Sequence, residues 1–204
     1  MSFKTLAAIA GAAAILCGCA TSTTGSAPPS SAAVAPYADT LALTGRLNAR
    51  YLKDGKQESV TVNFTWKQDA QRTDVALATQ FGNTVATIEV TPQGATLREG
   101  GSKAPVHAPS IDALSARALG WTLPVAGMRG WLQGHAIDAN GKPWSASPAN
   151  SEVTTREGWR LRYTGWQAGG ADGAPARPQR FDAEHPGSGE IQEMALRVFV
   201  EQVE

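Results

Sequence analysis

The strongest constraint on the fold is a two-residue alternation of apolar and polar side chains that begins near residue 41. Within LALTGRLNARY, Leu43 and Leu47 fall on one face and Arg46 falls on the other. A second alternating stretch, SVTVNFTWKQ, follows KDGK at 53–56, whose Asp-Gly pair is typical of a two-residue hairpin turn. Alternation of this kind indicates strands with one buried face. The folded part of the chain is therefore predicted to begin as an antiparallel sheet.

Strands and turns continue with similar spacing. Five short strands are predicted between residues 41 and 100, and they would form a meander. Ser110 is a credible N-cap for a helix to about residue 119, whereas 105–109 resembles a linker and 135–150 a loop. Further strands are predicted at 158–167, 180–185 and 190–203.

Apolar residues are concentrated at 118–134, in ALGWTLPVAGMRGWLQG. Gly120 and Pro124 interrupt the run, which we interpret as a helix end, a loop and a short helix. Such a segment must cover other apolar groups. It either closes an ordinary core, as most apolar helix faces do, or forms a lid over a cavity.

The amino terminus resembles a bacterial lipoprotein signal. Lys4 precedes an apolar run at 6–16 that has the length of a signal-peptide core and is too short to span a bilayer comfortably. The run ends in LCGC at 16–19, which is similar to a lipobox. This resemblance makes Cys19 the lipidated first residue of the mature chain, with Cys17 discarded in the signal. Plain secretory cleavage is the alternative.

Three segments follow from this interpretation: a signal peptide at 1–18, a lipidated flexible tether at 19–38 and a folded domain at 39–204. The tether is rich in Thr, Ser, Gly, Ala and Pro, a composition that cannot bury a core. Lipoproteins kept in the inner membrane commonly carry Asp after the lipidated cysteine, and this chain has Ala20. The expected location is the outer membrane, with a lipid anchor and the domain facing the periplasm.

The sequence offers little for catalysis or for nucleic-acid binding. Eighteen basic residues balance eighteen acidic ones, so no net charge attracts nucleic acid. The histidines, His107, His135 and His185, are too scattered for a metal site, and neither a G-x-S-x-G motif nor a phosphate loop occurs. We predict no catalytic residue, no metal and no cofactor.

Four short motifs, in order behind the lipobox, resemble the LolB family of outer-membrane lipoprotein receptors. They are LTGRL at 43–47, FTW at 64–66, GWTLPV at 120–125 with RGWLQG at 129–134, and GWRLRY at 158–163. The resemblance implies a mainly β fold with some α structure. It would be a curved antiparallel sheet that forms an unclosed barrel of about eleven strands, with short helices plugging the open side.

The same resemblance implies a function and a site. A LolB-like receptor accepts acylated lipoproteins from a periplasmic, LolA-like carrier into an apolar cavity. It then inserts them, as a monomer, into the inner leaflet of the outer membrane. The predicted lining residues of the cavity are Leu43, Leu47, Val62, Phe64, Trp66, Leu77, Ile88, Leu119, Trp121, Leu123, Met128, Trp131, Trp159, Leu161 and Tyr163.

Phe81 is an apolar residue in a predicted turn, where polar residues are usual. Its side chain either folds back onto the sheet or points outward. By resemblance it falls where the family carries an exposed apolar residue that touches the membrane, although Gln80-Phe81-Gly82 replaces the commoner Pro-Leu-Gly. We predict membrane insertion at Phe81.

Two other functions stay open at this point. The chain would be a non-catalytic scaffold lipoprotein for envelope assembly if its interior were filled. It would be a lipid-modifying esterase if a nucleophile were organised, and the sequence shows none.

Overall fold

A computed structural model describes residues 33–101, 103–119, 124–167, 177–187 and 191–203. The elements, in chain order, are β1 (Leu41–Lys53), β2 (Lys56–Gln68), β3 (Thr73–Ala78), β4 (Thr84–Thr91), β5 (Gly94–Glu99), β6 (Val106–Ala108), α1 (Ile111–Leu119), α2 (Val125–Trp131), β7 (His135–Ile137), β8 (Pro143–Ser145), β9 (Glu152–Thr154), β10 (Arg160–Gln167), β11 (Arg177–His185) and β12 (Ile191–Val203).

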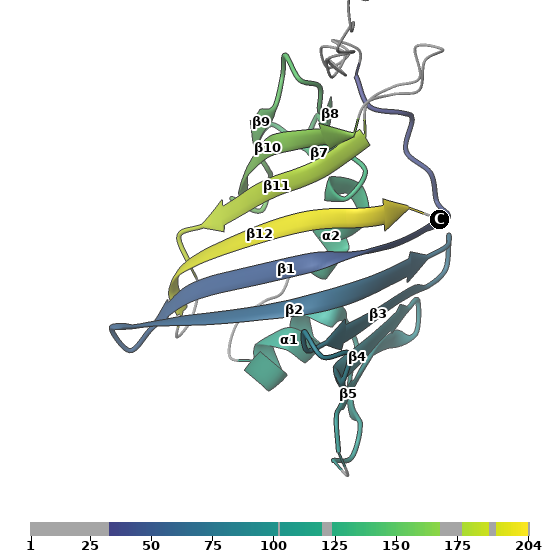
Figure 1. The fold of residues 1–204 in the computed structure, drawn as a ribbon, viewed down its shortest axis with the longest axis vertical. Helices are drawn as coiled ribbons and strands as arrows, with labels where there is room; N and C mark the ends of the chain where they lie inside the picture. The colour runs from purple at the N-terminus through teal and green to yellow at the C-terminus, as the bar shows by residue number, and fades with distance from the viewer. Residues whose placement is uncertain (1–32, 102, 120–123, 168–176, 188–190, 204) are drawn as a thin grey trace, which may run out of the picture.

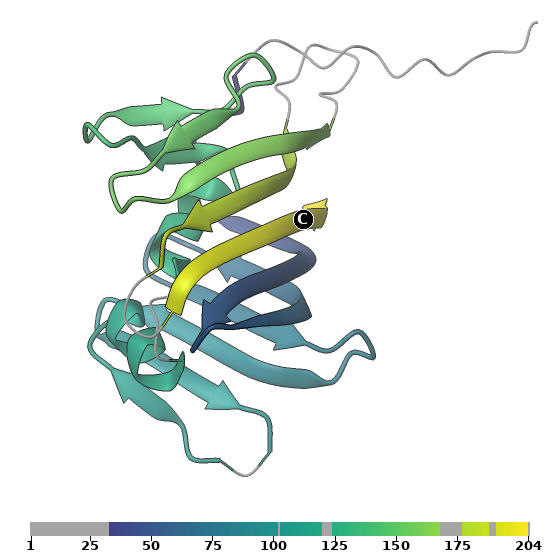
Figure 2. The same cartoon turned by 90° about the vertical axis from the view of Figure 1, so that its left-hand side faces the viewer.

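Ten of these strands form one antiparallel sheet, in the order β6-β5-β4-β3-β2-β1-β12-β11-β10-β9. β1 pairs with β12, so the first and last strands meet in the middle of the sheet, whereas β6 and β9 form its two edges. Figures 1 and 2 show the sheet curving around α1 and α2, with the short β7–β8 hairpin beside β10. The predicted fold class, an unclosed antiparallel barrel plugged by short helices, is confirmed.

The β1–β2 hairpin forms as its turn sequence predicts. Asp54 and Gly55 have φ angles of 50° and 71°, and Lys53 pairs directly with Lys56. Two central residues with positive φ define the turn type whose twist matches that of the flanking strands. This short turn fixes the register of the two longest neighbouring strands in the meander.

Alternation predicts most of the buried face correctly. In β12, Val198 and Val200 are buried and Phe199 between them is 39% exposed. Val60 was expected on the apolar face and is 48% exposed instead. The reason is its place in β2, whose first five residues are all exposed at the projecting end of the β1–β2 hairpin.

Both helices bury one side against the sheet. Ser110 caps α1 as predicted, because its Oγ accepts a hydrogen bond from the Ala113 N–H at 3.1 Å. Ile111 and Leu114 of α1, and Val125, Met128 and Trp131 of α2, are buried. Within the described ranges, neither helix has the length and apolar character that crossing a membrane requires.

Three segments differ from the sequence-based predictions. The expected linker at 105–109 contains β6, and the expected loop at 135–150 contains the β7–β8 hairpin. Each ladder pairs only three residues, which is too short for alternation to reveal. The third difference concerns the predicted tether, whose last residues, 33–38, contact the domain. Val34 is only 8% exposed, because its side chain packs against apolar residues of the domain rather than against its own segment.

Candidate functional site

The predicted lining residues lie on the concave side of the sheet and on the helices, where most of them pack together. One buried cluster contains nine of them: Leu43, Phe64, Trp66, Ile88, Met128, Trp131, Trp159, Leu161 and Tyr163. Leu47 and Leu77 are half-buried at its margin, and Val62 is also buried. Leu119 ends α1 but its side chain is not described, and Trp121 and Leu123 lie outside the described residues.

The sheet side of this cluster is filled by its own side chains. Leu43 and Trp66 are 2% exposed and Leu161 is 0% exposed, so other protein atoms cover these side chains almost completely. These strand residues were expected to line an apolar cavity, and in the structure they pack within the buried cluster. Their role as lining residues stays a prediction.

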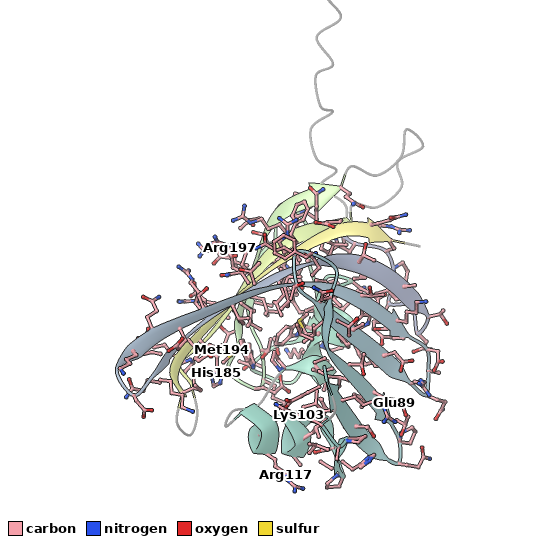
Figure 3. The ribbon with its side chains drawn as sticks, turned by 60° about the horizontal axis from the view of Figure 1, so that its bottom comes forward. Glu89, Lys103, Arg117, His185, Met194 and Arg197 are labelled. Carbon is pink, nitrogen blue, oxygen red and sulfur yellow. The ribbon has the colours of Figure 1, made fainter. Side chains whose placement is uncertain are left out.

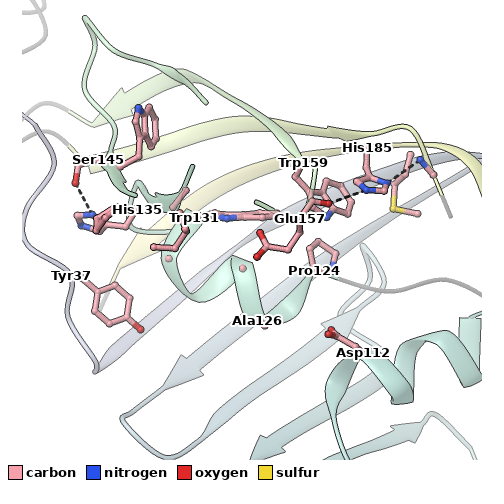
Figure 4. A pocket seen from close by; sticks show the side chains of 18 of the residues that line it. Tyr37, Asp112, Pro124, Ala126, Trp131, His135, Ser145, Glu157, Trp159 and His185 are labelled. Atoms are coloured by element: carbon pink, nitrogen blue, oxygen red, sulfur yellow. Dashed lines mark hydrogen bonds between the residues drawn. The ribbon is translucent and has the colours of Figure 1, made fainter. Parts of the chain in front are cut away.

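A cavity of about 790 Å³ lies beside the cluster. α2 forms one wall and the β7–β8 hairpin forms a second, whereas Glu157 and Trp159 before β10, the end of β11 and the start of β12 form a third (Figure 4). Trp131 and Trp159 belong both to this cavity and to the predicted set, and Met194 lines it from β12. Figure 3 places Met194 and His185 on the concave side of the sheet, with Arg197 on the outer side. A volume of this size is typical of ligand pockets.

Aromatic rings make this region rigid and apolar. The rings of Trp131 and Trp159 have centroids 5.6 Å apart, and His185 lies 5.0 Å from Trp159 on the other side. Trp144, from the hairpin, stacks on Tyr163 at 5.9 Å. Aromatic side chains bury much area with few rotatable bonds, so they offer a ligand a surface that needs little ordering.

Tyr163 joins the sheet to α2 through its phenol. Its Oη donates a buried hydrogen bond to the backbone oxygen of Trp131 at 2.9 Å. Burial raises the pKa of Tyr163 far above its usual value, so the phenol stays a neutral donor throughout the ordinary pH range. The bond fixes the carboxyl end of α2 over β10.

Arg129 holds α2 from its other side. Its guanidinium donates to the backbone oxygens of Asp69 and Arg72, at 2.6 and 3.2 Å, and to the hydroxyl of Thr73. All three acceptors belong to the β2–β3 turn or the start of β3. A seven-residue helix is too short to be stable alone, so these contacts keep α2 in place.

A serine and a histidine meet at the cavity without an acidic third group. His135 Nε2 lies 2.8 Å from the Ala35 carbonyl oxygen, so this nitrogen donates and Nδ1 accepts from Ser145 Oγ at 3.0 Å. A backbone carbonyl takes the place that a carboxylate holds in hydrolase triads. Among the described residues, no three His, Cys, Asp or Glu side chains gather as metal ligands.

Phe81 is 92% exposed in the turn between β3 and β4, in agreement with the outward orientation predicted for it. The turn is closed by hydrogen bonds from Gly82 N to Thr79 O at 3.0 Å and from Thr79 N to Asn83 O at 2.9 Å. Gly82 has φ of 84°, which suits glycine. The loop thus has internal bonds although it lacks the family's proline.

Sequence reasoning missed several residues of this cavity. Met194 was expected only as a strand residue, and Trp144, Ser145 and His135 were placed in a loop. Tyr37 was placed in the tether and lines the cavity. An aromatic residue in a segment otherwise made of small residues and proline was the signal available for Tyr37.

An unclosed antiparallel barrel plugged by short helices, with a largely apolar cavity beside α2, defines the structural class of this protein. Within this class, the family model described as "Outer membrane lipoprotein LolB" matches residues 39–202. The chain therefore belongs to the LolB family of outer-membrane lipoproteins.

Two curated relatives agree with this assignment. An outer-membrane lipoprotein LolB of Cupriavidus pinatubonensis is 40% identical over 150 residues, which cover 71% of this chain and 70% of the relative. One from Chromobacterium violaceum is 30% identical over 197 residues and covers 92% and 91% of the two chains. A crystal structure of a LolA superfamily protein from Nitrosomonas europaea aligns with a TM-score of 0.45 and 9% identity, over 84% of this chain and 87% of that one.

Proposed function

We propose that this protein is an outer-membrane lipoprotein receptor that accepts acylated lipoproteins and inserts them into the inner leaflet. The observation that carries the proposal is the aromatic cavity beside α2. Family membership supports the receptor role and a non-catalytic protein, and it gives no support to the esterase alternative. A scaffold lipoprotein would have no use for such a cavity.

The physical task explains the need for a cavity. Each buried methylene is worth about 0.8 kcal/mol, so the acyl chains of one lipoprotein together represent tens of kcal/mol in water. A protein that receives them must offer an apolar surface before the bilayer does. Trp131, Trp159 and Met194 supply that surface, and the strand residues below α2 would extend it if α2 moved outward.

The partners follow from the same role. A soluble periplasmic carrier of LolA type would deliver the client, and the outer membrane would take it. Lipidation at Cys19 would anchor the domain to that membrane, facing the periplasm, with the residues after Cys19 as a tether. Transfer needs no nucleotide in this chain provided that affinity for acyl chains rises from carrier to receptor to bilayer.

A cavity-filling substitution tests the proposal. Ala126 is exposed on α2 and lines the cavity, so Ala126→Trp adds a large side chain there without disturbing the core. We expect affinity for a fluorescent palmitate analogue to fall about tenfold, which corresponds to about 1.4 kcal/mol. Fluorescence titration of the purified protein measures it.

The matched control is Ala113→Trp, at an exposed position of α1 that does not line this cavity. It should bind the analogue as the wild type does. Absence of binding by the wild type would favour the scaffold, and hydrolysis of an ester analogue would favour the esterase.

A further inference from the structure

Residues 34–38, called the docking segment here, pack against the domain just before β1. Val34 donates its backbone N–H to Ala146 O at 3.0 Å, and its side chain lies over Gly134. A Cβ added at Gly134 would be 2.9 Å from Val34 Cγ1, so glycine at this position leaves the niche that Val34 fills. The contact is specific in shape as well as apolar.

The next residues continue the attachment with hydrogen bonds. His135 donates from Nε2 to Ala35 O at 2.8 Å. Two hydrogen bonds join Ala38 to the Gln133 side chain. The Ala38 N–H donates to Gln133 Oε1 at 2.9 Å, and Gln133 Nε2 donates to the Ala38 carbonyl oxygen at 3.0 Å. Gln68, at the end of β2, donates to Tyr37 Oη at 3.3 Å. The docking segment therefore connects the end of α2, the β7–β8 hairpin and β2.

Tyr37 brings this segment to the cavity. Its ring lies edge-on to the His135 ring, with centroids 6.1 Å apart, and it lines the same cavity as Trp131 and Trp159 (Figure 4). Tyr37 is 43% exposed, which leaves part of the ring available for contact. The docking segment thus forms part of the cavity wall through Tyr37.

We infer that the docking segment is a positioning element of the acyl-binding site, with Tyr37 as a wall residue that contacts a bound acyl chain. This inference rests on the proposed receptor function. Docking fixes Tyr37 and restrains the two walls made by α2 and the hairpin. A bound chain that touches Tyr37 stabilises the docked form in return, because binding and docking are linked reciprocally.

The same arrangement keeps the cavity near the membrane. Val34 is 15 residues after Cys19 (34 − 19), and an extended chain of that length spans at most about 50 Å. A tether attached elsewhere on the domain would allow the cavity to face away from the anchor. Docking beside the cavity places the acyl site at the end of the domain to which the tether is fixed.

A charge in the niche tests the inference. Val34→Asp places a carboxylate in the apolar contact with Gly134, and we expect affinity for the fluorescent palmitate analogue to fall about tenfold. Thr40→Asp is the control, because it adds the same charge at an exposed residue just before β1. Equal affinities for the wild type and Val34→Asp would overturn the inference.

Three further tests keep loss of folding apart from loss of docking. Thermal unfolding of both variants identifies temperatures at which each is folded, and Tyr37→Ala removes the wall ring while Val34 stays in place. Hydrogen exchange at the Val34 and Ala38 amides should slow when the analogue binds. Exchange rates that are the same with and without the analogue would contradict the inference. If the wild type bound no analogue, the proposed function itself would be wrong.

Discussion

Phe81 is the residue whose surroundings least resemble those of a typical phenylalanine. A large apolar side chain that is 92% exposed has no partner to pack against within its turn, where Gly82 and Asn83 are exposed too. Its burial in an acyl layer would be worth about 1.5–3 kcal/mol. That energy is available only at a membrane or at another protein, which is why we place membrane contact here.

Phe81→Glu should separate delivery from binding. We expect the fold and the affinity for the palmitate analogue to be unchanged, and insertion of an acylated lipoprotein into liposomes to slow about 10- to 100-fold. The insertion assay compares lipoprotein bound to the receptor with lipoprotein in the liposome fraction. Gln80→Glu is the control, since it adds charge beside the tip and keeps the phenyl ring. Unaltered insertion by Phe81→Glu would exclude a membrane role for this residue.

At the scale of elements, α2 is a short helix that contacts from neighbouring strands, turns and the docking segment hold in place. Tyr163 binds its carboxyl end from β10, Arg129 reaches the β2–β3 turn, and the docking segment contacts Gln133 directly after it. Neutral backbone oxygens accept most of these bonds, and such bonds contribute modestly and separately. Several separate contacts from different parts of the fold therefore hold α2 in place.

Arg129→Ala should loosen α2 and lower the free energy of unfolding by about 1–3 kcal/mol, because three acceptors lose one charged donor. The free energy of unfolding of Arg129→Lys should lie between those of the wild type and Arg129→Ala, since an ammonium group lacks the planar, multi-donor geometry of a guanidinium. Urea denaturation measures both. Arg117→Ala, at an exposed residue in the last turn of α1, should leave stability within about 0.5 kcal/mol of the wild type. Equal loss at Arg117 and Arg129 would contradict the role given to Arg129.

At the scale of the whole molecule, we assign separate roles to the open barrel and to the lipid anchor. The barrel supplies the cavity, and the lipid on Cys19 would keep it at one membrane at high local concentration. An anchored receptor meets its membrane without diffusing to it, which raises the effective concentration of the acceptor.

Cys19→Ala should therefore yield a protein that stays in the aqueous fraction and binds the palmitate analogue with wild-type affinity. Its insertion of lipoproteins into liposomes should slow, because the effective concentration is lost. Detergent phase partitioning and the insertion assay measure the two effects. Cys17→Ala is the control, since that cysteine would be removed with the signal peptide. Failure of Cys19→Ala to take up lipoprotein from a carrier would mean that the anchor does more than tether.

The sequence by itself determined the local elements and the inward face of the sheet. Asp54-Gly55 set the first hairpin, Ser110 set the start of α1, and alternation in β12 placed Val198 and Val200 on one buried face, because turn chemistry and strand period act between near neighbours. Only the tertiary structure decided that Val34 and Tyr37 pack against the domain, that Leu43 and Leu161 are buried in the core, and that the cavity lies beside α2. Those outcomes depend on the shapes of surfaces far apart in the chain, such as the niche at Gly134, and no period or motif reveals that Val34 fills it.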